Sequence, residues 1–385
     1  MQSRLILFET RMLGDTVLSF PFICAASDQY EIFICCQPES AVIAAHVLDE
    51  AHILAWRPPW MAKRNSSRRW FDKEDRRFLK QLRHIQPDIA VSAWADVRLH
   101  LWMLLSGAPR RVGFPMHASN FYGSHLDWRK RQLFLGRLVT VLLQTIMMRP
   151  LLTQKIYRNS SSQSHLSNWR QLAESLGIAS AWSATPPWFT VNSTNFDVKL
   201  RSFVNAAGQA HQKIWLLHPG GRNPVRRWPS SNFTAVVNDV FVRQNIPILI
   251  IHPPDTDFPV IKGNSVFNYT PDTIDDLIQT INAVDHVICN DSVASHLAAA
   301  LGKSAVVIMG PMTPDWFAPY GNQHRIVHNS GGCLYHPCLD TCRMPSVICM
   351  EAIKVEEVVR AVNEIISNDR RQAGIGIKKT QSCQQ

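Results

Sequence analysis

The chain has 385 residues, of which 46% are hydrophobic and 18% are charged. This composition excludes a wholly disordered chain, and the length fits two domains of roughly 150 to 200 residues each better than a single core. The 40 Lys and Arg residues outnumber the 30 Asp and Glu residues, which gives a formal net charge of +10. Such a charge favours an anionic partner, whether a phosphorylated small molecule, an acidic membrane surface or nucleic acid.

The N-terminus shows no cleavable secretion signal, because only a short apolar run precedes Glu9 and no small-residue cleavage site follows it. The chain carries nine cysteines, an odd number. Without a signal, such a number indicates mostly reduced thiols instead of a disulfide framework. We therefore expect a cytoplasmic protein.

The first half predicts a parallel sheet with crossover helices. Short apolar runs alternate with helical stretches, which is typical of this architecture. The predicted strands are residues 4–9, 30–36, 51–56 and 88–94. A basic and aromatic loop, residues 57–71, lies between the third and fourth strands.

An apolar segment with basic flanks, residues 129–150, follows these strands. Its uninterrupted apolar run falls short of the ~20 residues that span a bilayer. It is interpreted as a buried or domain-edge helix, and a helix lying on an anionic membrane surface is the alternative.

The second half repeats this pattern after a proline-bearing linker, residues 180–193. Its predicted strands are residues 213–221, 246–254, 286–291 and 305–311, and its predicted helices include residues 230–244, 273–283 and 350–367. The sequence thus predicts an N-terminal Rossmann-like domain over residues 1–185 and a second over residues 194–367. We expect residues 368–385 to form a disordered basic tail.

Three polar turns follow predicted strands, where open α/β sheets bind their ligands. The first is Leu-Gly-Asp, which ends at Asp15. A carboxylate at a helix start is often only a cap that stabilises the first turn. The alternative is a general base, because the preceding glycine allows a tight turn that exposes the carboxylate to a ligand.

The second turn is His-Pro-Gly-Gly-Arg-Asn-Pro-Val-Arg-Arg-Trp-Pro, residues 218–229. Gly220 and Gly221 permit close backbone approach to a ligand, and Arg222 and Arg226 supply cations beside them. The spacing is not that of a Walker loop. The turn is either a phosphate cradle or a solvated basic loop.

The third turn is Asn-Asp-Ser, which leads from a strand into an Ala-rich helix. Ser292 and His296 are four residues apart and share one helix face. Asp291 and Ser292 lie in the first turn, where backbone amides can hold a phosphate. A capping Ser and a buried His are the structural alternatives.

With these turns in view, the chain resembles the ADP-heptose:lipopolysaccharide heptosyltransferases, glycosyltransferase family 9. The resemblance covers residues 4–367. It is carried by Leu-Gly-Asp near the N-terminus, LSGAPRRVGFP at 105–115, HLSNWRQLAESLGI at 165–178, the HPGG and RRWP segments, and NDSVASHLAAALGKSAVVIMGPMTPDWFAPYG at 290–321. It implies the GT-B fold, an α/β architecture of two Rossmann-like doubly wound domains that face a cleft.

The resemblance also implies residue roles. Asp15 matches the catalytic aspartate, and the acidic residue that holds the ribose matches Asp255 or, equally, Asp257. The expected donor-binding residues are Gly220, Gly221, Arg222, Arg226, Asp255, Asp291, Ser292, Val293 and His296. Two positions depart from the family: Arg226 stands where Lys is common, and Val293 stands where Gly is frequent.

The implied reaction is an inverting, metal-independent transfer of heptose from ADP-heptose to a lipopolysaccharide core or related glycan, with no cofactor. The expected partner is a lipid-anchored anionic acceptor, which places the enzyme at the cytoplasmic face of the inner membrane of a bacterium. The acceptor-binding residues would be Arg57, Lys63, Arg64, Arg68 and Arg69. The alternative for this loop is a solubilising segment.

Three features leave alternatives open. Cys333, Cys338, Cys342 and Cys349 are interpreted as buried thiols or as a structural metal site, although their spacing misses the usual zinc pairs. A nicotinamide-dependent dehydrogenase would share the Rossmann-like halves, but it needs a G-x-G-x-x-G after the first strand, and this chain lacks one there. A non-catalytic nucleotide-sugar-binding protein, or a transferase of the same fold for another nucleotide sugar, remains an alternative, whereas nucleic acid is not expected as a partner.

Overall fold

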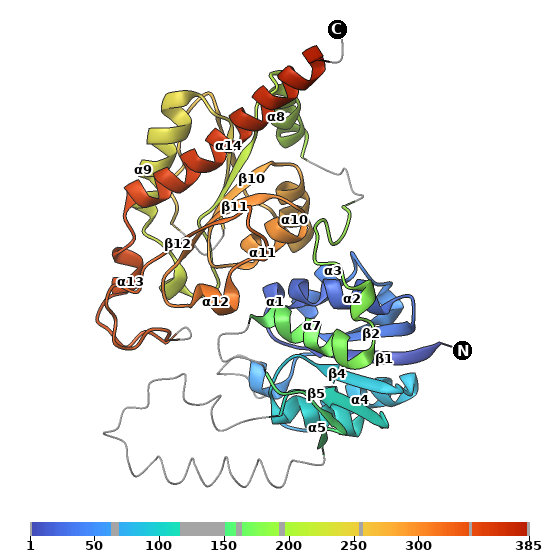
Figure 1. The fold of residues 1–385 in the computed structure, drawn as a ribbon. Coiled ribbons are helices and arrows are strands. Elements are labelled where there is room, and N and C mark those ends of the chain that lie inside the picture. Colours follow the sequence, from blue (N-terminus) through green and yellow to red (C-terminus); the bar gives the residue numbers. More distant parts are fainter. Residues whose placement is uncertain are drawn as a thin grey trace. The chain divides into compact units, whose positions relative to one another are not determined.

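In a computed structural model, the chain divides into two compact units, Met1–Val191 and Asn192–Gln385 (Figure 1). The structure describes residues 2–62, 69–115, 151–158, 164–191, 197–253, 257–338 and 341–382, with side chains to residue 371. The division lies inside the linker stretch that the sequence predicts. Each unit is an α/β layer structure, as the alternation of strands and helices predicts.

The first unit is built on a parallel sheet with the strand order β3-β2-β1-β4-β5-β6. Its strands are β1 (Ser3–Glu9), β2 (Tyr30–Cys36), β3 (Ile53–Ala55), β4 (Ile89–Ser92), β5 (Arg110–Gly113) and β6 (Gln154–Lys155). The central strand β1 is apolar along its middle because helices cover both of its faces.

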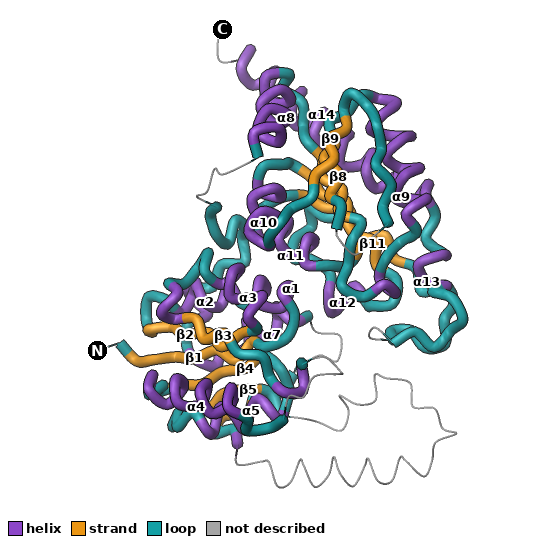
Figure 2. The backbone as a smooth tube through the Cα atoms, turned by 180° about the vertical axis from the view of Figure 1, so that it is seen from behind, coloured by secondary structure: helices purple, strands orange, loops and turns teal. Residues whose placement is uncertain are grey.

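Two helical layers cover this sheet (Figures 1 and 2). One face carries α1 (Leu13–Leu18), α2 (Phe20–Ala26), α3 (Pro38–Ala44) and α7 (His165–Leu176), and the other carries α4 (Lys73–Ile85) and α5 (Val97–Leu105). Short 3-10 turns span Glu50–His52, Pro59–Met61 and Ala179–Ala181. On the α4 face, the rings of Trp56 and Phe78 stack with centroids 4.4 Å apart.

The second unit has the strand order β12-β11-β10-β7-β8-β9, again with parallel pairs. Its strands are β7 (Trp215–His218), β8 (Ile248–Ile251), β9 (Val266–Tyr269), β10 (His286–Asn290), β11 (Ser304–Met309) and β12 (Arg325–His328). The two parallel six-stranded sheets with helices on both faces confirm the predicted α/β, GT-B fold class.

The helices of the second unit also form two layers, with α9 and α14 on one face and α10 and α11 on the other (Figures 1 and 2). Their bounds are α8 (Val198–Gln209), a 3-10 turn (Pro224–Arg226), α9 (Ser230–Val236) with a π-helical continuation (Val237–Val242), α10 (Ile274–Asn282), α11 (Val293–Ala300), α12 (Pro314–Phe317), α13 (Ile348–Glu351) and α14 (Val355–Ser382). The buried core between the sheet and α9 and α14 is made of aromatic and β-branched residues such as Trp215, Phe233 and Val362.

The C-terminal segment differs from the sequence-based expectation. A helix over residues 350–367 and a disordered tail over 368–385 are predicted, whereas α14 starts at Val355 and continues to Ser382. Beyond residue 367, the helix is held to the rest of the second unit by Asp369, whose Oδ2 lies 2.7 Å from Nε2 of His286. Residues 383–385 lie outside the described part of the chain.

Both strand orders reverse at one place, between β1 and β4 in the first sheet and between β7 and β10 in the second. At such a point the loops after two neighbouring strands diverge and leave room for a ligand beyond their carboxyl ends. The loops that follow β1, β4, β7 and β10 are therefore the places where each unit is expected to bind.

The predicted helix over residues 129–150 lies outside the described residues. Within the part of the chain that the structure describes, no helix combines the length and the apolar character needed to cross a bilayer.

Candidate functional site

In the first unit, a buried carboxylate closes the end of β1. Glu9 is fully buried. Its Oε1 accepts a hydrogen bond from Trp94 Nε1 at 2.8 Å, and its Oε2 lies 3.0 Å from His165 Nε2. His165 is the first residue of α7, and its ring stacks on that of Trp94 with the centroids 4.3 Å apart. The two side chains and the backbone N–H of Arg11 satisfy a charge that would otherwise be costly to bury.

Asp15 lies close to this pair, in the first turn of α1, and is 8% exposed. Its Oδ2 accepts a hydrogen bond from the Met12 N–H at 3.0 Å, so Asp15 does support the helix start. Burial raises the pKa of Asp15 to about 6, while the charge of His165 opposes the rise and that of Glu9 adds to it. A carboxyl group with this pKa is poised to take a proton near neutral pH, so capping and general-base roles are compatible.

The loops after β1 and β4 are joined by charged groups. Asp96, 3% exposed, lies 3.2 Å from Arg11 (Oδ2 to Nη2) and 2.6 Å from Arg98 (Oδ2 to Nη2). Burial by itself would raise the pKa of Asp96, but the hydrogen bonds and charges of Arg98 and Arg11 outweigh it and lower that pKa. The Arg11 guanidinium also lies 4.8 Å from the centre of the Trp94 ring.

In the second unit, Asn290 holds the two candidate donor loops together. It is the fully buried last residue of β10. Its Nδ2 donates to the carbonyl oxygens of Pro219 at 2.7 Å and Gly220 at 3.2 Å, and its Oδ1 accepts from the Trp228 N–H at 3.0 Å. One amide thus fixes both ends of the loop that follows β7.

Gly220 must be glycine for steric reasons, whereas Gly221 need not be. A Cβ at Gly220 would lie 2.6 Å from Pro253 Cγ and 3.0 Å from His218 Cε1. A Cβ at Gly221 would meet Arg227 Cγ at 3.8 Å, which is ordinary contact. The first glycine lets the loop after β7 pack on the loop after β8.

An ion pair bridges the loops after β7 and β10. Arg226 Nη1 lies 2.9 Å from Asp291 Oδ2, and the two side chains are 21% and 4% exposed. Asp291 is therefore buried behind the arginine, and its carboxylate orients the guanidinium. A planar guanidinium matches the geometry of an oxyanion better than a point charge does.

Ser292 and His296 lie at the start of α11. Ser292 occupies the N-cap position, but its hydroxyl makes no capping hydrogen bond, so the capping interpretation is wrong. Its Oγ is buried and has no hydrogen-bond partner among the described residues. His296 lies one turn on and is 7% exposed. A buried hydroxyl without a partner is a feature that a bound polar ligand would satisfy.

The structure thus brings most of the expected donor residues of the second unit to one edge of its sheet. Arg222 is exposed in the loop after β7, and Val293 is half-buried at the first position of α11. Asp255 lies outside the described residues, and Asp257 is exposed.

The expected acceptor residues are only partly described. Arg57 is ion-paired with Glu39 and lies 3.4 Å from Gln37 Oε1, and Arg69 is exposed. Lys63, Arg64 and Arg68 lie outside the described residues.

Sequence reasoning missed Glu9, His165 and Asn290 as members of the sites. Glu9 carries a signal, a charged residue directly after an apolar strand. His165 is 156 residues away along the chain, so no local pattern joins the two. Asn290 is part of the polar triplet, but its role becomes visible only when the strand order places β7 beside β10.

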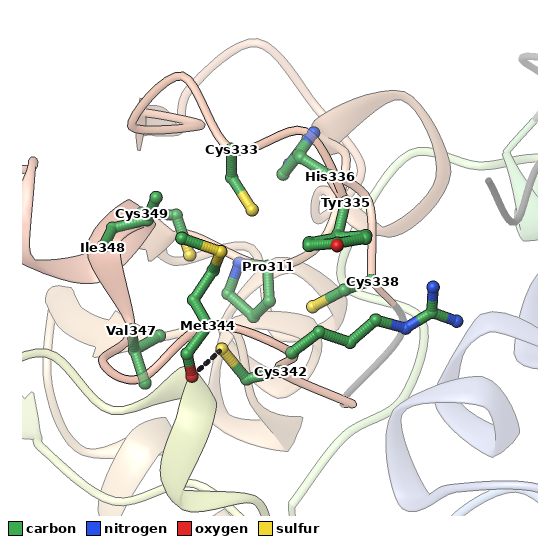
Figure 3. Close-up of a pocket in the computed structure, with 11 residues that line it drawn as sticks. Pro311, Cys333, Tyr335, His336, Cys338, Cys342, Met344, Val347, Ile348 and Cys349 are labelled. Carbon is green, nitrogen blue, oxygen red and sulfur yellow. Dashed lines mark hydrogen bonds between the residues drawn. The ribbon is translucent and has the colours of Figure 1, made fainter. Parts of the chain in front are cut away.

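The four C-terminal cysteines line one small cavity of about 10 Å³, together with residues such as His336 and Met344 (Figure 3). The eight described cysteines are all free thiols. Of the four C-terminal cysteines only Cys349 is buried, so the buried-thiol interpretation is wrong for Cys333, Cys338 and Cys342, which are partly exposed. Burial raises the pKa of Cys349 to about 11. No group of three or more His, Cys, Asp or Glu side chains in the described part of the chain is arranged to hold a metal ion.

Comparison with known proteins gives a consistent result. A model of glycosyltransferase family 9 (heptosyltransferase) matches residues 76–347. A family 9 glycosyltransferase structure from Veillonella parvula is 14% identical, with a TM-score of 0.65 over 95% of this chain and 97% of that one. The E. coli ADP-heptose LPS heptosyltransferase II is 15% identical, with a TM-score of 0.62 over 95% and 99%.

The E. coli heptosyltransferase WaaC with ADP gives a TM-score of 0.61 at 15% identity, over 94% of this chain and 99% of that one. No curated protein matches the sequence.

The close contact at Gly220 leads to a stability prediction. We expect Gly220→Ala to lower the free energy of unfolding by about 1–3 kcal/mol, because the new methyl group overlaps Pro253. Gly208→Ala is the matched control, since a Cβ there meets nothing within 4 Å and the residue lies in α8. Chemical denaturation should show the control equal to or more stable than the parent. Equal losses in both variants would contradict the steric argument.

The raised pKa of Asp15 leads to a pH-dependent prediction. Protonation of Asp15 favours the folded state, so this stabilisation is complete below the unfolded pKa near 4 and is lost as the pH rises through about 6. Asp15→Asn should therefore match the parent near pH 4 and exceed it by about 3 kcal/mol at pH 8. Denaturation curves across this range test it, and a variant that is less stable at pH 8 would contradict it.

Proposed function

The chain belongs to glycosyltransferase family 9, the heptosyltransferase family, and on this basis we propose that it transfers a heptose from ADP-heptose to a lipopolysaccharide core or related glycan. The single observation that carries the proposal is the donor loop pair of the second unit. At the carboxyl ends of β7 and β10, where the strand order reverses, lie Arg226 in its ion pair with Asp291, the Gly220–Gly221 turn and the buried hydroxyl of Ser292.

The proposed donor site binds the diphosphate through groups that lie ready before the donor arrives. The amides of the Gly220–Gly221 turn and the Ser292 hydroxyl would donate to phosphate oxygens, and Arg226 would supply positive charge. Negative charge builds on the diphosphate as the glycosidic bond breaks, so fixed donors stabilise the transition state more than the ground state. His296 lies one turn along α11 and would donate to the same anion.

The proposed base is Asp15. It would remove the proton from an acceptor hydroxyl as that oxygen attacks the anomeric carbon, while the nucleoside diphosphate leaves from the opposite face. Such a displacement inverts the anomeric configuration in one step and forms no glycosyl-enzyme intermediate.

The proposed acceptor is an anionic, lipid-anchored glycan at the cytoplasmic face of the inner membrane. The net charge of +10 favours an anionic surface and an anionic acceptor. Arg57 and Arg69, with Lys63, Arg64 and Arg68 of the same loop, would contact the acceptor's charged groups. These contacts would weaken as salt is added, since exposed charges are screened.

The metal independence of the proposed transfer rests on the family resemblance. Residues 255–257 have the sequence Asp-Thr-Asp. They follow Pro253, whose ring limits the space at Gly220. Paired carboxylates can bind a divalent cation, so the activity assay includes a chelator.

The central prediction separates an enzyme from a binding protein. With ADP-heptose and a deacylated core oligosaccharide, Asp15→Asn should lower turnover by about 100-fold or more, because the base is lost. The affinity for ADP-heptose, measured by calorimetry, should stay within about twofold, and parent turnover should persist in EDTA. In a thermal-shift panel, ADP-heptose should stabilise the parent most, in proportion to affinity.

Three results would count against the central prediction. Unchanged turnover in Asp15→Asn would remove Asp15 from the chemistry. A larger thermal shift with a UDP-sugar than with ADP-heptose would reassign the donor. Loss of parent turnover in EDTA would contradict the metal-free transfer.

The unpaired hydroxyl gives a sharper test of the donor site. Ser292→Ala should leave the free energy of unfolding unchanged or slightly higher, because it removes a buried group that has no partner among the described residues. It should weaken ADP-heptose binding by about tenfold, since one hydrogen bond to the diphosphate is lost.

Ser295→Ala is the matched control on the same helix, because the Ser295 hydroxyl donates to the Ser292 carbonyl oxygen at 2.7 Å. We expect the opposite pattern there, a loss of about 1 kcal/mol of stability with donor affinity largely kept. A stability loss without an affinity loss in Ser292→Ala would show that the hydroxyl is structural.

A further inference from the structure

The outer face of α4, in the first unit, is lined by basic side chains. This helix covers one face of the sheet together with α5 (Figure 2). Its inner side is apolar, with Phe78 and Leu82 buried in the core. The exposed basic residues on its outer side recur every three or four positions, so they form one stripe along the helix. They are Lys73, Arg76, Arg77, Lys80 and Arg83.

The positive charge of this α4 stripe is not balanced by acidic side chains. Asp75 is buried, where its carboxylate accepts hydrogen bonds from the Trp56 ring and the Phe71 N–H. Glu74 is the neighbour of Lys73 in sequence and therefore lies on another side of the helix. Among the described residues, no ion pair involves any basic side chain of the stripe. A solubilising surface normally mixes both signs, so a stripe of one sign points to an anionic partner.

Two exposed aromatic rings lie at the N-terminal end of the α4 stripe. Trp70 and Phe71 directly precede the helix and are 45% and 44% exposed. The Trp70 ring stacks on that of Trp60 with the centroids 5.0 Å apart, and the Phe71 ring lies 5.8 Å from that of the fully buried Trp102. Nε of Arg76 donates to the Phe71 carbonyl oxygen at 3.1 Å. The two rings are therefore fixed beside the stripe, with nearly half of each side chain open to solvent.

We propose that the α4 stripe and the Trp70–Phe71 pair form the surface by which this protein docks on an anionic lipid bilayer. This inference rests on the proposed function in its assignment of a lipid-anchored acceptor. Lysine and arginine side chains are attracted to anionic headgroups, and exposed aromatic rings enter the boundary between headgroups and acyl chains. The first contribution is electrostatic and the second is apolar, so they respond differently to salt.

Nucleic acid is the other polyanion that a basic surface can bind. Proteins that bind single strands combine a cationic groove with rings on which successive bases stack. On this unit the basic residues lie on the outer side of a helix, and the exposed rings gather at one end of them. This arrangement favours a bilayer, and the test includes DNA as a competitor.

The test measures vesicle binding and does not require activity. The parent should co-sediment with mixed vesicles of phosphatidylcholine and the anionic phosphatidylglycerol, but not with vesicles of phosphatidylcholine alone. Arg77→Gln/Lys80→Gln should weaken binding to the mixed vesicles about 25-fold, because each cation near an anionic bilayer contributes about fivefold. Both positions are exposed and Gln is a good helix former, so the free energy of unfolding should stay unchanged.

Lys354→Gln/Arg360→Gln is the matched control, because both residues are exposed in the second unit and the variant loses the same amount of charge. It should bind the mixed vesicles within about twofold of the parent, since these cations lie outside the proposed surface. Trp70→Ala tests the apolar contribution and should weaken binding about three- to tenfold. Its loss should be similar at low and high salt, whereas the loss in the α4 charge variant should shrink as salt is added.

The inference fails on any of three results: equal binding of the parent to both kinds of vesicle, equal losses in the α4 charge variant and its control, or release of the vesicle-bound parent by duplex or single-stranded DNA at a matching phosphate concentration. With a deacylated acceptor in solution, Arg77→Gln/Lys80→Gln should turn over like the parent, and only transfer to acceptor in vesicles should fall. Failure of the proposed function looks different, because the parent would be inactive with ADP-heptose while the pattern of vesicle binding remained.

Discussion

The arrangement of the second unit depends on one buried amide. Asn290 stands at the end of β10, where the strand order reverses and β7 becomes its neighbour. Three backbone groups of the loop after β7, namely the carbonyl oxygens of Pro219 and Gly220 and the N–H of Trp228, would each lose a buried hydrogen bond if this side chain were apolar. The amide therefore fixes the loop after β7 relative to α11, and the groups proposed to bind the donor inherit that geometry.

In the first unit, charged side chains instead of an amide hold together the loops at the reversal of the strand order. Its strand order reverses between β1 and β4, and the loops there are joined by Glu9 with Trp94 and by Arg11 with Asp96. Both edges carry an arginine–carboxylate ion pair, Arg11 with Asp96 in the first unit and Arg226 with Asp291 in the second.

The sequence predicted the central strands well, because buried parallel strands are short runs of apolar residues between turns. It missed β5, β6, β9 and β12, which are short and only partly buried, so their pattern differs little from that of a loop. Local motifs singled out Asp15 and Ser292, whose roles stay predictions. They did not reveal the Glu9–His165 pair, since its two members come from opposite ends of the first unit and only the packing of α7 brings them together.

The position of Asp291 changes how the donor site should be understood. Sequence motifs suggest that this carboxylate contacts the donor, yet it is buried behind Arg226 and neutralises part of the charge that would attract a diphosphate. The Asp291 carboxylate reduces the attraction between Arg226 and a diphosphate, but it holds the guanidinium in one orientation. An arginine side chain that is not held in this way would lose rotamer entropy on binding. In the proposed site, neutral hydrogen-bond donors would then contribute more of the binding free energy for the diphosphate. These donors are the Gly220–Gly221 amides and the Ser292 hydroxyl. In the proposed donor site, this arrangement would bind a diphosphate less tightly than unpaired cations would, and so would favour release of the product after each transfer.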